Sequence, residues 1–300
     1  MNYIQKAQFQ LLTSRCRGAK NVEQQNLQNK DKNMTRYKVI LEYDGTDLIG
    51  WQENRQGPSV QSLVKDAIEQ FCGARPDIVG AGRTDSGVHA VAMTAHFDID
   101  GDHSPETVMR ALNFYLANKP VSVLGCSVVS DEFNARFDCI ARHYKYVVLN
   151  RSAAPVLQKN RVYWVPRKLD VDAMRAATEK LIGNHDFTSF RASECQAKSP
   201  IKTLDKIDIT TDGDLIVFEF SARSFLHHMV RNLMGTLYAI GRHELPPAAF
   251  LDILAKKDRS IAPPTASGDG LYFINAYYPE RFQQLLPHAP LTPVWLNLPD

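Results

Sequence analysis

Hydrophobic and polar residues alternate along residues 36–43, which predicts a β-strand with its apolar side chains on one face. A helical stripe of apolar residues follows, which Ser59 can cap and Gly73 closes. The same reasoning predicts strands at 77–82 and 90–98, a helix that opens at Ser104-Pro105, and strands at 121–129 and 143–149. The order is therefore β-α-β-β-α-β with one added strand.

A similar order follows in the second half, without a repeat at the level of residues. It comprises a strand at 161–166, a helix from Asp170 to Gly183, a hairpin of 204–210 and 215–222, a helix at 225–241 and a strand at 270–277. Two split βαβ units predict an α+β fold with two ferredoxin-like, RRM-like lobes, whose antiparallel sheets join side by side around a central cleft. We expect an N-terminal lobe at residues 35–150 and a C-terminal lobe at 151–280.

The two ends of the chain differ from this body. The chain has 35 Lys and Arg against 33 Asp and Glu, a net charge of +2, but residues 1–34 alone hold six basic and two acidic residues. The remaining residues are thus slightly acidic. The first segment has no sustained period, which predicts a disordered extension; an artefact before a true start at Met34 and a targeting peptide are the alternatives. Residues 281–300 are proline-rich and predict an irregular C-terminal extension.

Composition excludes several classes of protein. The chain is 44% hydrophobic and 23% charged, which is ordinary for a folded globular protein. It has no run of about 18 apolar residues, so the sequence predicts no membrane-spanning helix. Its five cysteines form no C-x-x-C pair, which argues against a disulfide framework or a structural zinc site and favours a reducing, cytoplasmic location.

The most informative segment is residues 80–90, Gly-Ala-Gly-Arg-Thr-Asp-Ser-Gly-Val-His-Ala. A glycine-rich turn between strands is the plain interpretation. A phosphate cradle fails, because Asp85 stands where the sixth position of G-x-G-x-x-G requires glycine and no helix follows. What remains is a carboxylate on a tight loop with Arg83 beside it. A nearby guanidinium keeps a carboxylate ionised, which is the state that a nucleophile needs.

This loop resembles the signature loop of the tRNA pseudouridine synthase A family, with Ser86 where many members have alanine. Further motifs follow the family's order. They are Tyr-Asp-Gly-Thr at 43–46, Gly-Trp-Gln at 50–52, Ser-Val-Gln at 59–61, Phe-Asn-Ala-Arg-Phe at 133–137, Arg-His-Tyr-Lys-Tyr at 142–146, Phe-Leu-His-His-Met-Val-Arg-Asn at 225–232, Ala-Pro-Pro at 262–264 and Gly-Leu-Tyr at 270–272. The resemblance covers about residues 36–280.

The resemblance implies an isomerase that converts uridines 38 to 40 of the tRNA anticodon stem-loop into pseudouridine, without a cofactor or a metal. It implies that Asp85 is the nucleophile, attacking the sugar C1′ or the uracil C6 or assisting elimination to a glycal. Tyr144 is implied at the active site, Arg231 as the partner of the aspartate, and Arg83 as the group that helps to extrude the target nucleotide. It also implies a homodimer that binds tRNA across both subunits, with no obligatory partner protein.

Each of these assignments has a structural alternative. The resemblance places Tyr144 and Leu271 at the uracil. Without it, the strand position of Tyr144 favours core packing, and core packing is the equal alternative for Leu271. Arg231 lies in an apolar helix, where a guanidinium is costly to bury unless it meets an anion. His227 and His228 are not expected to bind a metal, because neighbours on a helix do not converge and no carboxylate accompanies them.

Contacts to RNA are expected first from basic side chains, each of which can also be an ordinary solvated charge. The candidates are Arg110, Arg136, Arg142, Lys145, Arg151, Lys198, Lys202 and Lys206. Since the body is slightly acidic, these groups must gather around a cleft. The alternative function is an RNA-binding protein without chemistry, but the aromatic strand motif typical of RNA-recognition domains is missing.

Overall fold

The structure is a computed structural model that describes residues 34–282. Ten strands form one sheet, in which eight follow the order β4-β1-β3-β10-β5-β9-β8-β7, while β2 pairs with β3 and β6 with β5. The strands are β1 Met34–Tyr43, β2 Val79–Gly80, β3 His89–Asp100, β4 Val121–Val129, β5 Ala141–Leu149, β6 Tyr163–Trp164, β7 Gly183–Asp186, β8 Ile201–Asp212, β9 Leu215–Ala222 and β10 Leu271–Tyr277.

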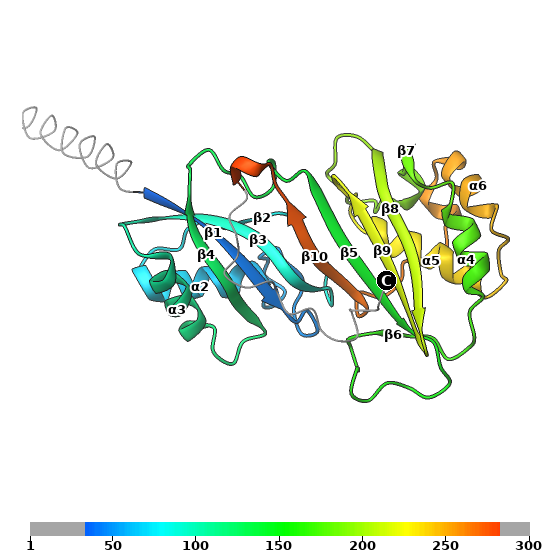
Figure 1. Ribbon diagram of the computed structural model, residues 1–300, viewed down its shortest axis with the longest axis horizontal. Helices are drawn as coiled ribbons and strands as arrows, with labels where there is room; N and C mark the ends of the chain where they lie inside the picture. The colour runs from blue at the N-terminus through cyan, green and yellow to red at the C-terminus, as the bar shows by residue number, and fades with distance from the viewer. Residues whose placement is uncertain (1–33, 283–300) are drawn as a thin grey trace, which may run out of the picture.

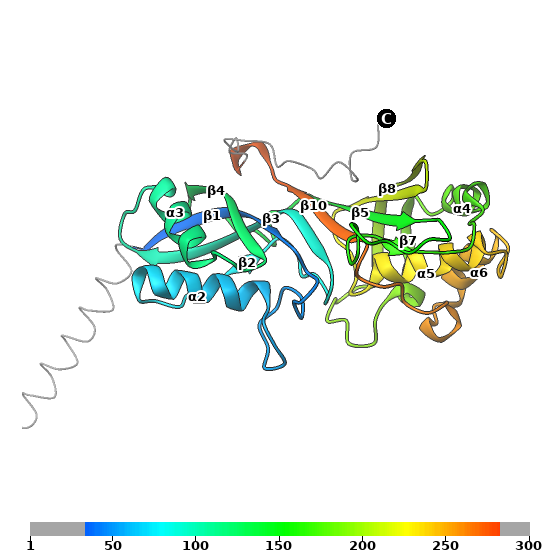
Figure 2. The same cartoon turned by 90° about the horizontal axis from the view of Figure 1, so that it is seen from below.

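The five α-helices of the described residues form two groups, one against each half of the sheet (Figure 2). They are α2 Val60–Cys72, α3 Pro105–Tyr115, α4 Val171–Thr178, α5 Met229–Gly241 and α6 Ala249–Lys256. None of these helices is both long enough and apolar enough to cross a bilayer, a finding that covers residues 34–282 only. The α+β class is therefore confirmed.

The first helix begins and ends as the sequence predicts. The Ser59 hydroxyl accepts the backbone N–H of Ser62 at 3.0 Å, and the Ser62 hydroxyl accepts the N–H of Ser59, so the two form a capping box. Gly73 ends the helix in the left-handed conformation, with φ +72°. Residues of the apolar stripe predicted from the sequence share one hydrophobic core with Tyr37, Val39 and Leu41 of β1, which are completely buried.

The last strand, β10, lies at the centre of the sheet between β3 and β5 (Figure 1). It runs parallel to β3, with Tyr272 opposite His89, and antiparallel to β5, with Phe273 opposite Tyr144. Strand β5 in turn pairs with β9 along its length. The end of the folded chain thus joins the two halves into one sheet. The lobe boundary at residue 150 and the ferredoxin-like character of each lobe stay predictions.

Two elements differ from the prediction in ways that affect function. The helix expected from Phe225 begins only at Met229, because His228 adopts a left-handed backbone with φ +61°. The helix expected to reach Gly183 ends at Thr178, and Gly183 begins β7 instead. The extensions predicted at 1–34 and 281–300 lie outside the described residues, apart from Met34 in β1 and Arg281 and Phe282 in a short 3-10 helix.

Candidate active site

Residues 81–88 connect β2 to β3 and hold the predicted aspartate in the middle of the molecule. The loop rests on the segment after β1, where two glycines allow an approach that no side chain would tolerate. A Cβ added to Gly45 would lie 2.1 Å from the Val88 carbonyl oxygen, and one on Gly50 would lie 2.5 Å from that of Thr84. Residues 43–46 and 50–52 therefore lie directly against the loop.

A second segment, just before β10, holds the loop from the other side. A Cβ on Gly268 would lie 2.6 Å from the Ser86 carbonyl oxygen. His89 links both segments, because its Nδ1 accepts the N–H of Gly45 at 3.1 Å and its Nε2 lies 3.1 Å from the Asp269 carbonyl oxygen. The loop is thus held between residues that are more than 200 positions apart.

Asp85 projects from this loop toward the start of α5. Its Oδ2 accepts a hydrogen bond from Nη1 of Arg231 at 2.9 Å, and its Oδ1 lies 3.3 Å from Nε2 of His227. Nε2 of His228 lies 3.4 Å from Oδ2. Burial by itself raises the pKa of the Asp85 carboxyl, but His227, His228 and Arg231 together lower it below its usual value. The carboxylate is ionised and only 18% exposed.

The two histidines overturn an expectation from the sequence. They converge on Asp85 because the left-handed backbone of His228 precedes the helix, and their ring centres are 4.0 Å apart. Both imidazoles and the carboxylate offer ligand atoms that lie within 4.8 Å of one another, an arrangement that can hold a metal ion. The two neighbouring histidines therefore do converge and do have a carboxylate beside them, so both reasons given against a metal were wrong. That the reaction needs no metal stays a prediction.

Tyr144 lies in β5 next to the loop of residues 81–88, which is called the catalytic loop below after its predicted role. Its ring packs edge-on against Phe225 and Phe273, and only 7% of the residue is exposed. A Cβ on Gly82 would lie 3.5 Å from the Tyr144 hydroxyl, so the hydroxyl borders the loop. Burial raises the pKa of this hydroxyl far above its usual value, which keeps it protonated at neutral pH. Tyr144 combines the core packing of the plain interpretation with a place beside Asp85's loop.

Comparison with known proteins agrees with this geometry. The family model described as tRNA pseudouridine synthase matches residues 39–138 and 177–279. The tRNA pseudouridine synthase A of Rhodopseudomonas palustris strain BisA53 is 47% identical over 245 residues, which is 82% of this chain and 100% of the relative. That of Paramagnetospirillum magneticum is 44% identical over 245 residues, 82% of this chain and 96% of the relative.

The chain belongs to the tRNA pseudouridine synthase A family. It is therefore an enzyme, an isomerase. The predicted family is confirmed, and the loop that carries Asp85 lies within the matched residues. The matched residues include both faces that hold the loop, so the clamped geometry lies within the shared part of the chain.

Two of the side chains predicted to contact RNA are exposed near the loop that carries Asp85. Arg83 is exposed and reaches Gln196, with 3.4 Å between Nη1 and Oε1. Arg136 is also exposed, and burial together with the charges of Arg83 and Arg142 lowers its pKa. The two guanidinium groups are thus close enough to repel each other. Leu271 is 4% exposed and its β10 position is opposite Tyr146, so it lies in the core face next to the site.

Three other candidates have positions that do not favour a contact with RNA. Arg142 is 8% exposed, and its guanidinium donates to the carbonyl oxygens of Ala81, Arg136 and Arg223. It braces the catalytic loop, which does not fit a contact with RNA. Lys145 alternates with Tyr144 along β5, so it points to the opposite face of the sheet, where its Nζ is 2.9 Å from Glu219. Arg110 is on α3, under edge strand β4 and far from the loop (Figure 1).

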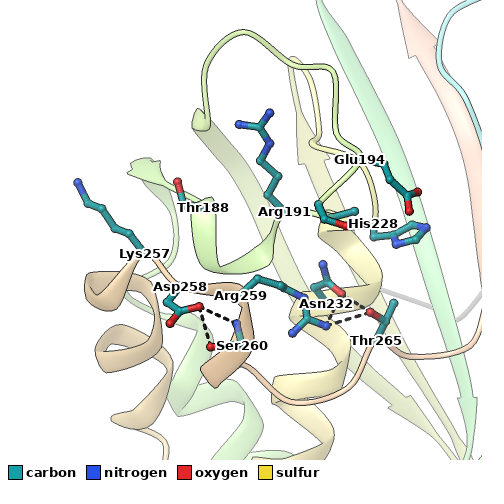
Figure 3. Close-up of a pocket in the computed structure, with 12 residues that line it drawn as sticks. Thr188, Arg191, Glu194, His228, Asn232, Lys257, Asp258, Arg259, Ser260 and Thr265 are labelled. Carbon is teal, nitrogen blue, oxygen red and sulfur yellow. Dashed lines mark hydrogen bonds between the residues drawn. The ribbon is translucent and has the colours of Figure 1, made fainter.

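A cavity of about 630 Å³ adjoins the site on the side of α5 (Figure 3). Asn232 of α5, His228 just before that helix, and Arg191 line it. Arg259 lines its floor, where it donates to Asn232 and Thr265. Arg191, Arg259 and Thr265 had no signal in the sequence, because they come from separate segments that share no motif. Basic and acidic side chains both line the cavity, since Glu194 and Asp258 accompany the arginines.

Proposed function

We propose that this enzyme converts uridines 38 to 40 in the anticodon stem-loop of tRNA into pseudouridine, with Asp85 as the nucleophile. The observation that carries the proposal is the Asp85 carboxylate, kept ionised by Arg231 and His227 on a loop held rigidly from two sides. The curated relatives are named for action on tRNA, which supports the same substrate. We further propose a cytoplasmic homodimer that needs neither a cofactor nor a protein partner.

The reaction breaks the C1′–N1 bond, turns the uracil and joins C1′ to C5, whose proton is released. An ionised carboxylate attached for part of this sequence divides one difficult rearrangement into easier steps. Attack at C1′, attack at C6 and elimination to a glycal all require the carboxylate in this state. The Tyr144 hydroxyl stays protonated and therefore cannot act as a strong base. We assign the Tyr144 ring a contact with the uracil ring, and the hydroxyl the relay of the C5 proton to water.

The target base has to leave its stack to reach Asp85. Flipping a nucleotide costs a few kcal/mol of unstacking, and a cation near the vacated position offsets part of it. Arg83 is the exposed guanidinium two residues from Asp85 and serves this role in the proposal. Arg136, close by, adds a second positive charge for the phosphates. The body of the chain is slightly acidic in total, so this local concentration of cations supports a site for RNA.

The decisive experiment is release of tritium from unmodified tRNA that carries [5-³H]uridine. Wild-type enzyme should release it, and Asp85→Asn, which keeps the shape but not the charge, should release none. Ser86→Ala is the matched control on the same loop, since many relatives of this family have alanine there, and should remain active. If wild-type enzyme releases no tritium from any of the three positions, the proposal is wrong.

The alternative function, binding of RNA without chemistry, makes the opposite prediction. Under it, wild type and Asp85→Asn bind tRNA equally and neither releases tritium. Binding should weaken steeply with salt in both cases, because phosphate contacts release counterions. The ordered pair of Asp85 and Arg231 favours the enzyme, since a binding surface has no need of a buried carboxylate.

A further inference from the structure

The connection between β4 and β5 contains a turn whose shape is determined by one asparagine. Oδ1 of Asn134 accepts the backbone N–H groups of Arg136 at 3.0 Å and Phe137 at 3.1 Å. The backbone N–H of Asn134 donates to Oδ2 of Asp138 at 2.7 Å, and that of Asp138 donates back to the Asn134 carbonyl at 3.0 Å. Four hydrogen bonds within five residues make this a rigid turn.

The turn buries one aromatic ring and presents another to solvent. Phe133 and Ala135 are completely buried, whereas Phe137 is 74% exposed. The Arg136 guanidinium carbon lies 5.7 Å from the centre of the Phe137 ring, so a cation accompanies the exposed ring. A large apolar side chain held outside the core by a rigid turn contributes little to folding. A lone exposed ring is ordinary on a protein surface, but this one is held by a rigid turn, beside a cation, and next to the buried Arg142.

The same turn is connected to the catalytic loop by a buried side chain. Nη2 of Arg142 donates to the Arg136 carbonyl at 2.8 Å and to the Ala81 carbonyl at 2.7 Å, and its Nε donates to Ala81 at 2.9 Å. Ala81 belongs to the loop that carries Asp85, so Arg142 fixes the turn against that loop, in which Arg83 follows two residues after Ala81. The exposed ring thus has a defined place relative to Asp85.

We propose that Phe137 and Arg136 form a stacking platform for an unpaired RNA base next to the target uridine. The inference rests on the proposed function and deepens it. Unpaired bases are recognised by stacking on exposed aromatic rings and guanidinium planes, and neighbouring cations take the adjacent phosphates. Arg83 and Arg136 supply those cations here. A protein partner is less suited, since the Arg136 guanidinium beside the ring matches the negative charge of RNA.

The test compares full-length variants in tRNA binding and in turnover. Phe137→Ala should raise KM and the Kd for unmodified tRNA about tenfold, the loss expected for one stacked base. The kcat of Phe137→Ala at saturating tRNA should stay unchanged. Phe137→Trp, which keeps an aromatic ring, should bind tRNA like wild type. Phe114→Ala is the matched control, because Phe114 is also 74% exposed but lies on α3, away from the site. It should bind like wild type.

Photocrosslinking gives a readout that does not depend on activity. An anticodon stem-loop with 5-iodouridine beside the target position should crosslink to the peptide that contains Phe137, and Phe137→Ala should abolish that crosslink. Unchanged Kd in Phe137→Ala, or an equal loss in Phe114→Ala, would overturn the proposal. So would conversion of a dimer into a monomer by Phe137→Ala in sedimentation, which would make the ring a subunit contact. Absent tritium release by wild type would instead overturn the proposed function, while the crosslink still tests the platform.

Discussion

Nη1 of Arg231 lies 2.9 Å from Oδ2 of Asp85, although 146 positions separate the two residues. Both side chains are more than four-fifths buried, at 17% and 18% exposed. Arg231 is itself held, because its Nε donates to the Ala266 carbonyl at 2.8 Å. The pair therefore joins α5, the catalytic loop and the segment that leads to β10.

Replacing Arg231 should impair chemistry more than binding. Arg231→Met removes a hydrogen bond to a charged group, a loss of about 1.5–3 kcal/mol, so kcat should fall by roughly 10- to 100-fold. Arg231→Lys keeps the charge but not the fork and should fall between that variant and wild type. Single-turnover tritium release measures the step. A normal kcat in Arg231→Met would show that the pair has no part in catalysis.

Replacing Arg142 should destabilise the protein. The buried guanidinium braces the Ala81 and Arg136 carbonyls, so Arg142→Gln should lower the free energy of unfolding by about 3 kcal/mol. Arg136→Gln, at an exposed position, should change it by less than about 0.5 kcal/mol. Urea denaturation distinguishes the two. Equal stability of both variants would contradict the bracing role.

Two arginines should differ in their effect on the salt dependence of tRNA binding. Arg83→Gln should reduce the slope of log K against log salt by roughly one, the value of one phosphate contact. Arg110→Gln should leave the slope unchanged, because Arg110 lies under the edge strand with Glu106 as its neighbour. Titrations at several salt concentrations give both slopes. A reduced slope in Arg110→Gln would extend the RNA footprint to α3.

A methyl group at Gly45 should displace the catalytic loop. The added Cβ would lie 2.1 Å from the Val88 carbonyl oxygen, so Gly45→Ala should cost about 1–3 kcal/mol in stability and most of the activity. Gly73→Ala is the control, since no heavy atom lies within 4 Å of its Cβ. It should cost only about 1 kcal/mol for its left-handed backbone, with kcat intact. The melting temperature and kcat of both variants are the measurements.

Acid should destabilise the fold through His96. Its Nδ1 accepts the Ala135 N–H at 3.1 Å, and burial together with the charge of Arg36 lowers its pKa to about 4. The unfolded chain takes up this proton near pH 6.5, so the stability that neutral His96 provides is complete above that pH. It is lost between pH 6.5 and 4, by at most about 1.4 kcal/mol per pH unit. Urea unfolding of wild type and His96→Gln across this window measures the difference, and identical slopes would contradict it.

Local signals predicted the elements well, because their causes are local. The Ser59 cap, the alternation of β1 and the proline that opens α3 each depend on residues a few positions apart. The apolar pairs at 225–226 and 229–230 predict a helix from Phe225. The left-handed backbone of His228 instead delays the start of α5 to Met229. Helix α6 was missed entirely. Arg142 and Lys145 were interpreted as surface cations because charge alone does not reveal burial.

The family and the loop with its aspartate can be recognised from the chain's residues alone, since short motifs carry them as contiguous positions. The groups that surround Asp85 come together only when the chain folds. The pairing of β10 between β3 and β5 brings residues 266–270 against the loop, and α5 brings Arg231 and both histidines. These contacts depend on long-range packing, which no spacing in the chain encodes. For the same reason, an almost neutral total charge does not reveal that the exposed Arg83 and Arg136 both lie near the loop that carries Asp85.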